Sequence, residues 1–329
     1  MENNEELDDP MVSLGEFLPV TEAAAIASAR WLGRGDKISA DQAAVDAMRR
    51  EFSKLPISGR VVIGEGEKDE APELYNGEEL GAGGMEVDIG VDPLEGTDLV
   101  ARGDDGAIAI CVIAERGGIL SAPDMYMNKL CVGATSKGKV DIRADIGDNL
   151  RAVADAHGRD LQDITAIVLD RPRHEELIEN IRSLGARIRL IPDGDITASM
   201  SAAVRGTGDH IYVGAGGSTE GVITAAALAC LGGEIQAQFA PKDDEQRQKL
   251  AEFGITDLEQ VLGIADLASA PLYVIATGVT GGNLMRPVRY FGGGARTHSI
   301  ALNLRRRTIR FIETVHMLDV KPGQAISLR

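Results

Sequence analysis

Residues 86–98 read EVDIGVDPLEGTD, and the interpretation of the chain starts from this stretch. Its first half alternates as an extended strand does, with Val87 and Ile89 on the face expected to pack into a core and acidic residues on the other face. Pro93 cannot donate a hydrogen bond to a sheet and disfavours a helix at the residue before it. We therefore expect the strand to end at Asp92.

Four oxygen-bearing side chains leave this strand together: Asp92, Glu95, Thr97 and Asp98. Carboxylates this close repel one another, and one of them takes up a proton unless a positive charge lies among them. A divalent cation is the simplest such charge, and hard oxygen ligands suit Mg²⁺ or Mn²⁺. A solvated acidic turn is the alternative for this stretch alone, but the other motifs of the chain favour a metal site.

Composition and charge restrict the class of protein. The chain has 329 residues with a net charge of −17, from 34 Lys+Arg against 51 Asp+Glu, and it lacks a long basic stripe. This length predicts two domains, and this charge argues against nucleic acid as a partner. The acidic start, MENNEELDDP, does not have the pattern of a signal peptide, and no apolar run approaches about 18 residues. We expect neither export by that route nor a membrane span.

Cysteine usage indicates the compartment. Cys111, Cys131 and Cys230 are widely spaced and lie in apolar runs, which is typical of buried thiols rather than of disulfides or zinc ligands. A reducing cytoplasm fits this pattern.

Strands and helices are expected to form an α/β protein of two domains. Residues 1–15 are acidic at their start and predicted to be disordered. Residues 16–150 are predicted to form a metal-binding α/β domain. From about residue 150 strands and helices alternate, which predicts a parallel sheet with right-handed crossovers in a second α/β domain, residues 151–329. Two paired strands, 297–304 and 308–316, are expected at the C-terminal end of that domain.

Two more carboxylates of the first region are candidate metal ligands. Ser39 with Gln42 predicts a capping box at the start of a helix, and Asp41 lies in its first turn on the inward stripe, where it needs a partner. Glu65 lies between two glycines after a short buried strand at 60–64, so a sharp turn holds it close to something. Structural explanations stay open for both: a cap on free amides for Asp41, and a solvated acidic loop for Glu65.

Three loops of the second region follow predicted strands. They are residues 170–174 (DRPRH), 192–195 (PDGD) and 214–220 (GAGGSTE). Ligands of parallel sheets bind beyond the carboxyl ends of the strands, so we expect these loops to share one edge. Arginine pairs hold phosphate by paired hydrogen bonds, aspartates accept bonds from hydroxyls, and the glycine run leaves free amides at a helix start. The combination suits a phosphorylated polyol.

Seven segments of the chain form one recognisable set. They are 31–37 (WLGRGDK), 62–67 (VIGEGE), 91–97 (VDPLEGT), 122–127 (APDMYM), 171–174 (RPRH), 192–195 (PDGD) and 216–221 (GGSTEG). Together they resemble class II fructose-1,6-bisphosphatase. The resemblance covers about residues 16–316. The DPLEGT element alone is shared by the wider metal-dependent, lithium-sensitive sugar and inositol phosphatases. The RPRH region and the 291–297 tail (FGGGART) look most like the branch that also hydrolyses sedoheptulose 1,7-bisphosphate, whereas Ser218-Thr219 departs from the more usual Ala-Pro.

The resemblance implies a layered α/β sandwich with two α/β domains and the active site between them. It also implies two Mg²⁺ or Mn²⁺ ions, one at Asp41 and Glu65 and the other at Asp92, Glu95 and Glu220. The implied substrate-binding residues are Glu95, Gly96, Thr97, Tyr126, Arg171, Pro172, Arg173, Asp193, Gly194, Asp195 and Gly217.

The implied reaction is hydrolysis of the 1-phosphate of fructose 1,6-bisphosphate to fructose 6-phosphate and phosphate. Thr97, oriented by Asp41, is expected to position the attacking water, with Lys37 compensating charge. The family further implies a homodimer or homotetramer. The alternatives are an inositol-type monophosphatase and a non-catalytic sugar-phosphate sensor. Several phosphate-handling loops favour a bisphosphate, and a complete set of metal ligands argues against the sensor.

Overall fold

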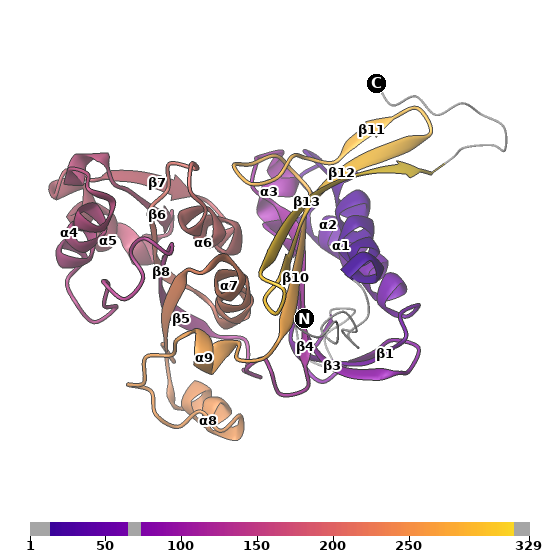
Figure 1. Cartoon of the computed structure of the whole chain (residues 1–329), viewed down its shortest axis with the longest axis horizontal. Coiled ribbons are helices and arrows are strands. Elements are labelled where there is room, and N and C mark those ends of the chain that lie inside the picture. The colour runs from indigo at the N-terminus through magenta and orange to yellow at the C-terminus, as the bar shows by residue number, and fades with distance from the viewer. Residues whose placement is uncertain (1–13, 65–73, 319–329) are drawn as a thin grey trace, which may run out of the picture.

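The computed structural model describes residues 14–64 and 74–318, which form five layers. In Figure 1 two β-sheets alternate with three layers of helices, so that the order is helices, sheet, helices, sheet, helices. Three apolar cores fill the spaces between successive layers. This arrangement confirms the predicted layered α/β sandwich. Among the described helices, none combines the length and the apolar character needed to cross a membrane.

The first sheet contains eight strands within the described residues. They are β1 (Ile57–Ile63), β2 (Glu79–Leu80), β3 (Met85–Glu95), β4 (Ile108–Glu115), β10 (Leu272–Gly278), β11 (Arg289–Phe291), β12 (Gly294–Asn303) and β13 (Thr308–Met317). β1 and β3 are parallel, and the other pairs are antiparallel. β13 pairs with β12 along its length, so the predicted pair of C-terminal strands is confirmed.

β3 carries the acidic stretch and differs from its prediction in two ways. It continues through Pro93 to Glu95, with a register shift against β4 between Asp92 and Glu95. Such a bulge is where a sheet accepts a residue that cannot donate a hydrogen bond. Its residues from Val87 to Glu95 are all buried, so the expected solvent face was wrong. The acidic side chains are enclosed because the middle layer of helices covers that face.

The second sheet has the strand order β7-β6-β8-β5-β9. These strands are β7 (Arg187–Ile191), β6 (Thr165–Leu169), β8 (Ile211–Gly217), β5 (Tyr126–Val132) and β9 (Glu234–Phe239). The predicted parallel arrangement is confirmed for β6, β7 and β8, whereas β5 runs antiparallel to both of its neighbours.

The predicted domains, with a boundary at residue 150, would place each sheet on one side of that boundary. Both sheets instead contain strands from both sides of it. β5 lies before that boundary and joins the second sheet, while β10 to β13 lie after it and complete the first sheet. β10 is buried over its whole length and pairs with the equally apolar β4, Ile275 lying opposite Cys111. An apolar strand of this kind is stable only in the interior of a sheet, and the first sheet offers that place.

Helices cover every face of the two sheets. On the outer face of the first sheet lie α1 (Leu14–Ala29) and α2 (Lys37–Phe52), between the sheets lie α6 (Asp195–Ala203) and α7 (Ser218–Leu231), and on the outer face of the second sheet lie α4 (Ile146–His157) and α5 (Glu175–Ser183). The shorter helices are α3 (Thr97–Arg102), α8 (Asp244–Glu252) and α9 (Ile264–Leu267). Most side chains of α7 are small or apolar on all sides of the helix, which suits a helix that packs between two sheets.

Two helix starts differ from the predictions. α1 begins at Leu14, inside the segment 1–15 that was expected to be disordered. α2 begins at Lys37 because the Asp36 carboxylate caps it, accepting the Ser39 backbone N–H at 2.9 Å. The predicted capping box was therefore wrong, and the Gln42 amide instead donates to Asp46 on the next turn at 2.8 Å.

The core between the two sheets predicts a large cost for truncating α7. Ile223 is 1% exposed and belongs to the cluster that includes residues of both sheets. Ile223→Ala should lower the free energy of unfolding by about 2–5 kcal/mol, measured by urea denaturation followed by circular dichroism. The matched control is Ile38→Ala on α2, because Ile38 is 78% exposed and its truncation should change stability by less than about 0.5 kcal/mol. Equal effects of the two variants would contradict the central position of α7.

Candidate active site

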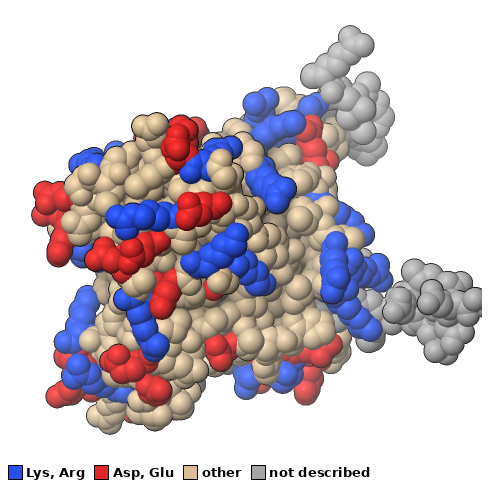
Figure 2. Space-filling view, turned by 60° about the vertical axis from the view of Figure 1, so that its left-hand side comes forward, with Lys and Arg blue, Asp and Glu red and all other residues tan. Residues whose placement is uncertain are grey.

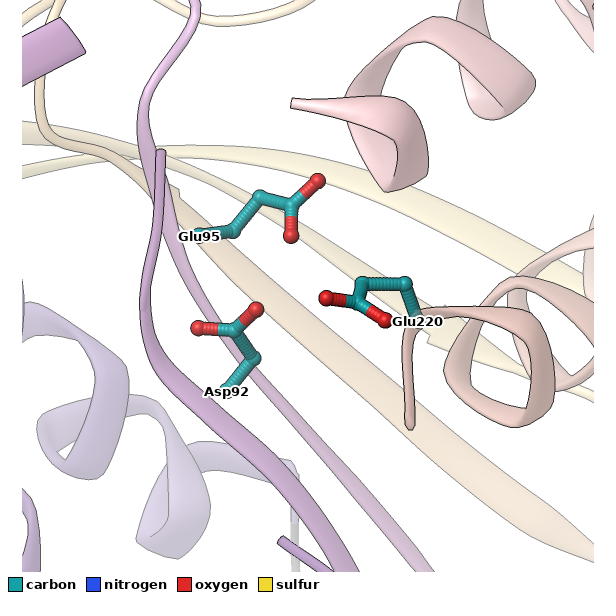
Figure 3. Close-up of side chains that lie close together, drawn as sticks. All are labelled: Asp92, Glu95 and Glu220. Carbon is teal, nitrogen blue, oxygen red and sulfur yellow. The ribbon is translucent and has the colours of Figure 1, made fainter. Parts of the chain in front are cut away.

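Three carboxylates from two layers meet at the end of β3. Asp92 and Glu95 project from β3, and Glu220 faces them from the first turn of α7 (Figure 3). One oxygen of each residue lies within 4.8 Å of the others. Asp92 and Glu220, 128 positions apart in the chain, thus lie in one cluster of the kind that can hold a cation. The cluster contains the three residues predicted as ligands of one metal.

Burial makes it energetically unfavourable for these three carboxylates to be ionised together unless a positive charge lies among them. Asp92 and Glu95 are buried, and Glu220 Oε2 is a buried atom without a hydrogen-bond partner among the described residues. Burial, followed by the charge of Asp195, raises the pKa of Glu95 well above its usual range and that of Glu220 to about 7. A divalent cation removes this penalty by favouring the ionised carboxylates.

The donor set fits a hard divalent cation. All three residues offer carboxylate oxygens, which suit Mg²⁺ or Mn²⁺, and the cluster has no sulfur or imidazole donor. Asp41 lies half-buried in the second turn of α2, not in the first turn as predicted, because the helix begins at Lys37. It is not part of this cluster, and Glu65 lies outside the described residues. The predicted metal site at Asp41 and Glu65 stays a prediction.

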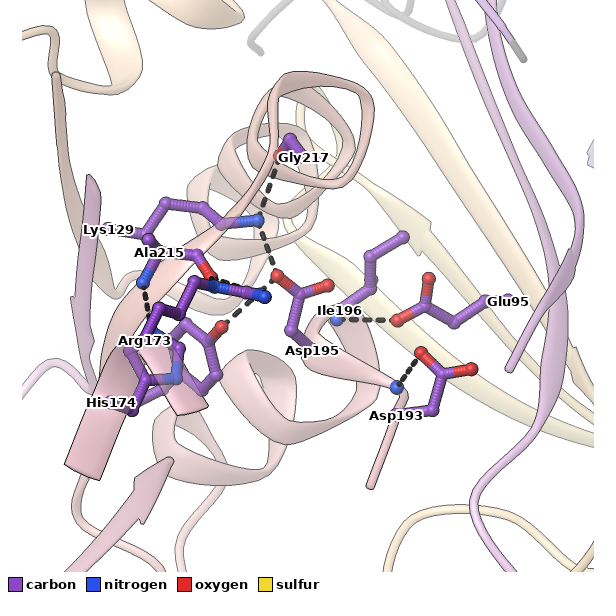
Figure 4. A network of polar contacts seen from close by, with 11 residues as sticks. Glu95, Lys129, Arg173, His174, Asp193, Asp195, Ile196, Ala215 and Gly217 are labelled. Atoms are coloured by element: carbon purple, nitrogen blue, oxygen red, sulfur yellow. Dashed lines mark hydrogen bonds and ion pairs between the residues drawn. The ribbon is translucent and has the colours of Figure 1, made fainter. Parts of the chain in front are cut away.

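A buried ion pair lies directly beside the carboxylates. The Lys129 ammonium on β5 donates to Asp195 at the start of α6 and to the Gly217 carbonyl at 2.9 Å (Figure 4). Lys129 is 1% exposed, and its pKa is nevertheless raised, because the charges of Asp195 and Glu220 outweigh the effect of burial. The Tyr212 hydroxyl donates to the same Asp195 oxygen at 3.1 Å. This ion pair was not predicted.

The burial of Lys129 could have been predicted from the apolar residues two positions before and after it. Lys129 lies two residues from Met127 and from Cys131 on β5, and both of these are fully buried. Side chains two apart on a strand share a face, so the ammonium had to enter the core and required a carboxylate there.

Glu95 also connects the two layers that form the site. Its Oε1 accepts the backbone N–H of Ile196 at 2.8 Å, in the first turn of α6 (Figure 4). Ser218, which departs from the usual family sequence, fixes the start of α7: its hydroxyl donates to the Pro123 carbonyl at 2.7 Å and accepts the Met125 N–H at 3.1 Å. The Glu220 loop is therefore held on the segment that leads into β5.

A cavity of about 400 Å³ opens beside the carboxylates, with Glu220 and Asp195 in its wall. The three polar loops expected at one edge of the second sheet all contribute to it. The predicted substrate-binding residues that line it are Tyr126, Arg171, Arg173, Asp193, Asp195 and Gly217. The predicted residues Glu95, Gly96, Thr97, Pro172 and Gly194 lie outside this lining.

Cationic groups gather at the mouth of the cavity. The Arg173 guanidinium donates to the Ala215 carbonyl at 2.8 Å and lies 4.9 Å from the centre of the Tyr126 ring. Lys242, which was not predicted, lies 4.4 Å from the same ring. Burial raises the pKa of Asp193, and the Gly194 N–H and then the charge of Arg171 oppose that rise. Both Asp193 and Arg171 line the cavity.

The remaining predicted residues lie at the ends of helices. Gly96 and Gly194 precede α3 and α6 with φ angles of 90° and 88°, which only glycine adopts without strain. Thr97 is the first residue of α3 and is half-buried. The Lys37 ammonium is exposed and lies 3.2 Å from the Asp98 carboxylate, which follows Thr97 in the chain.

Comparison with known proteins identifies the family. The model for bacterial fructose-1,6-bisphosphatase, glpX-encoded, matches residues 12–316. The chain belongs to this family. The resemblance seen in the sequence is confirmed, and this bisphosphatase is a class II fructose-bisphosphatase, a hydrolase of carbohydrate metabolism.

Curated relatives align with this bisphosphatase over nearly its whole length. A protein of Synechococcus sp. (strain JA-2-3B'a(2-13)) is 46% identical over 340 aligned positions, covering 95% of this chain and 98% of its own. A protein of Microcystis aeruginosa (strain NIES-843) is 45% identical, covering 92% and 96%, respectively. Both are named D-fructose 1,6-bisphosphatase class 2/sedoheptulose 1,7-bisphosphatase.

The buried pair predicts a strong effect of removing the Lys129 charge. Lys129→Met leaves Asp195 buried beside two further carboxylates without its cation, which should cost about 3–5 kcal/mol of unfolding free energy in urea denaturation. Lys242→Met is the control, because Lys242 is exposed and should change stability by less than about 0.5 kcal/mol. If Lys129→Met were as stable as the unsubstituted protein, the pair would not balance the carboxylates.

Proposed function

We propose that this bisphosphatase hydrolyses the 1-phosphate of fructose 1,6-bisphosphate and also acts on sedoheptulose 1,7-bisphosphate. The main support is that two features adjoin: a cluster of three carboxylates, two of them buried, and a cavity that is lined by Glu220 of this cluster and by Arg171 and Arg173. One phosphate can lie on the cation side and the other against the guanidinium groups. The names of the curated relatives support the second substrate.

The cation is proposed to be Mg²⁺ or Mn²⁺, held by Asp92, Glu95 and Glu220, with a second ion at Asp41 and Glu65. When bound, such ions neutralise charge on the phosphoryl group and lower the pKa of a coordinated water. Glu95 is kept in place for this task by the Ile196 N–H, and Glu220 by the anchored start of α7.

The side chains around the cavity have separate proposed roles. Arg171 and Arg173 bind the phosphate remote from the reaction, Asp193 and Asp195 accept hydrogen bonds from sugar hydroxyls, and Tyr126 covers the sugar. In the reaction a water oxygen bonds to phosphorus in line as the bond from phosphorus to the sugar oxygen breaks.

Water positioning and charge compensation complete the proposed site. We assign the Thr97 hydroxyl, oriented by Asp41, to position the attacking water, and Lys37 to add positive charge beside Asp98. The Lys37–Asp98 contact at 3.2 Å supports the second assignment.

Assembly and location are also proposals. We propose a homodimer or homotetramer in the cytoplasm that uses neither nucleic acid nor a membrane as a partner. The exposed β13 side chains Ile309 and Phe311 support self-association, and the three free cysteines support a reducing compartment. Acidic and basic side chains alternate over the face drawn in Figure 2, with no continuous basic stripe there.

Glu220→Gln tests the metal site. Replacing one carboxylate oxygen with an amide removes a charged ligand, so phosphate release from fructose 1,6-bisphosphate should fall at least about a hundredfold with Mg²⁺ or Mn²⁺. EDTA should abolish turnover of the unsubstituted protein. The control is Glu176→Gln, an exposed residue of α5. Full activity of Glu220→Gln, or turnover in EDTA, would exclude a metal at this cluster.

Arg173→Gln tests the bisphosphate assignment against the alternatives. Losing one charge-assisted contact to the remote phosphate should lower kcat/KM for fructose 1,6-bisphosphate about tenfold to a hundredfold, mostly through KM. An inositol-type monophosphatase would instead turn over inositol 1-phosphate, with or without Arg173. A sensor would bind the bisphosphates without releasing phosphate. Arg182→Gln, on the exposed side of α5, is the matched control.

A further inference from the structure

The second sheet has another cavity, at the end opposite the active site. Its volume is about 680 Å³, and it is lined by the segment after β5, the end of α4, the end of α6 and the loop that leads into β8. We call it the distal pocket. Its charged and titratable lining residues are His157, Arg159, Arg205, Asp209 and His210.

Positive charge dominates the distal pocket. Asp209 is the one carboxylate among its described lining residues, and it is already engaged: Arg189 lies 3.0 Å away, and the Ser201 hydroxyl donates to it. Arg159 and Arg205 form no ion pair with any carboxylate of the described residues, and Arg205 donates a long hydrogen bond, of 3.4 Å, to the Thr135 hydroxyl.

Two hydrogen-bond donors face each other in this pocket. The backbone N–H of Thr165 donates to His210 Nδ1 at 3.0 Å, so that nitrogen carries no proton. The proton of the neutral ring is then on Nε2, and Nε2 lies 3.2 Å from Nη1 of Arg159, which is always a donor. Two donors at this distance repel unless an acceptor lies beside both. A water oxygen can accept from both donors, but an anionic oxygen accepts more strongly, because its bond to the guanidinium is charge-assisted.

The two arginines also affect the histidine His157 in this pocket. Burial first, and then Arg159 and Arg205, lower the pKa of His157, whose ring lies edge-on to that of His210 with centroids 5.0 Å apart. Small residues such as Gly133 and Ala203 form much of the remaining wall, so the space is open to a ligand rather than filled by side chains.

We propose that the distal pocket binds a small phosphate-bearing anion, with Arg159, Arg205 and His210 Nε2 as its donors. The volume accommodates a phosphorylated metabolite and also inorganic phosphate. This site is separate from the active-site cavity, since the two share no lining residue.

Continuous elements connect the two sites. α6 begins with Asp195 in the active site and ends in the wall of the distal pocket, and α7 extends from Glu220 to Leu231 in the same way. The 14 residues of α7 span about 21 Å. An anion that draws the ends of α6 and β8 together acts on elements whose other ends hold Asp195 and Gly217.

The test is hydrogen exchange of the metal-loaded full-length protein, titrated with inorganic phosphate and separately with ribose 5-phosphate. We expect each to slow exchange in residues 202–210, and to do so equally in Arg173→Gln, in which one of the proposed active-site phosphate contacts is removed. Arg159→Gln and Arg205→Gln should each weaken this effect about tenfold to a hundredfold, whereas Arg182→Gln should not. Both arginines are exposed, so neither substitution should unfold the protein.

The two titrations separate the possible sources of the anion. Tighter binding of ribose 5-phosphate assigns the pocket to a phosphorylated metabolite, and equal binding assigns it to free phosphate. Protection limited to residues 169–173 and 214–220 in every variant would place all phosphate in the active site and overturn the proposal. Unchanged protection of residues 202–210 in both Arg159→Gln and Arg205→Gln would overturn it as well.

Discussion

Mutual repulsion among buried carboxylates is the constraint on which this structure depends. Asp92, Glu95 and Glu220 lie within 4.8 Å of one another, and Asp195 lies beside them with its own charge. Lys129 is the one buried lysine or arginine among the described residues, and its ammonium pairs with Asp195 rather than lying among the three clustered residues. The three clustered carboxylates therefore keep an excess of negative charge, and the proposed divalent ion would neutralise it.

The layered architecture determines where that charge can gather. Two of the three carboxylates come from the first sheet and the third from the helix layer between the sheets, so the cluster forms only when these layers pack together. The Glu95–Ile196 hydrogen bond crosses the same boundary. Apolar packing of α7 against both sheets supplies the free energy that holds the like charges close. Stability and metal affinity are thus coupled through one interface.

The sequence was informative wherever local chemistry determined the outcome. The acidic residues of 86–98 and the loops after β6, β7 and β8 could be recognised because parallel strands bring their carboxyl ends to one edge. Partner choice between strands could not be predicted, because an apolar strand such as β10 is compatible with either sheet. Burial of Asp92 contradicted the alternation of β3, since that pattern cannot reveal that a second layer covers the polar face. Lys129 was missed because its partner, Asp195, is 66 residues away.

The same continuity that assembles the active site also explains the chemistry at the other end of the second sheet. β5, α6 and α7 each carry a residue of the candidate active site near their N-terminal end. The opposite ends of all three lie around the distal pocket. In a chain with a net charge of −17, carboxylates are abundant, and several arginines of the second half pair with one, as Arg187 does with Asp163. Arg159 and Arg205 do not, and Arg159 faces a histidine N–H instead. The distal pocket thus has more hydrogen-bond donors than acceptors, although the protein as a whole is acidic. Binding of an anion from solution would supply the acceptor.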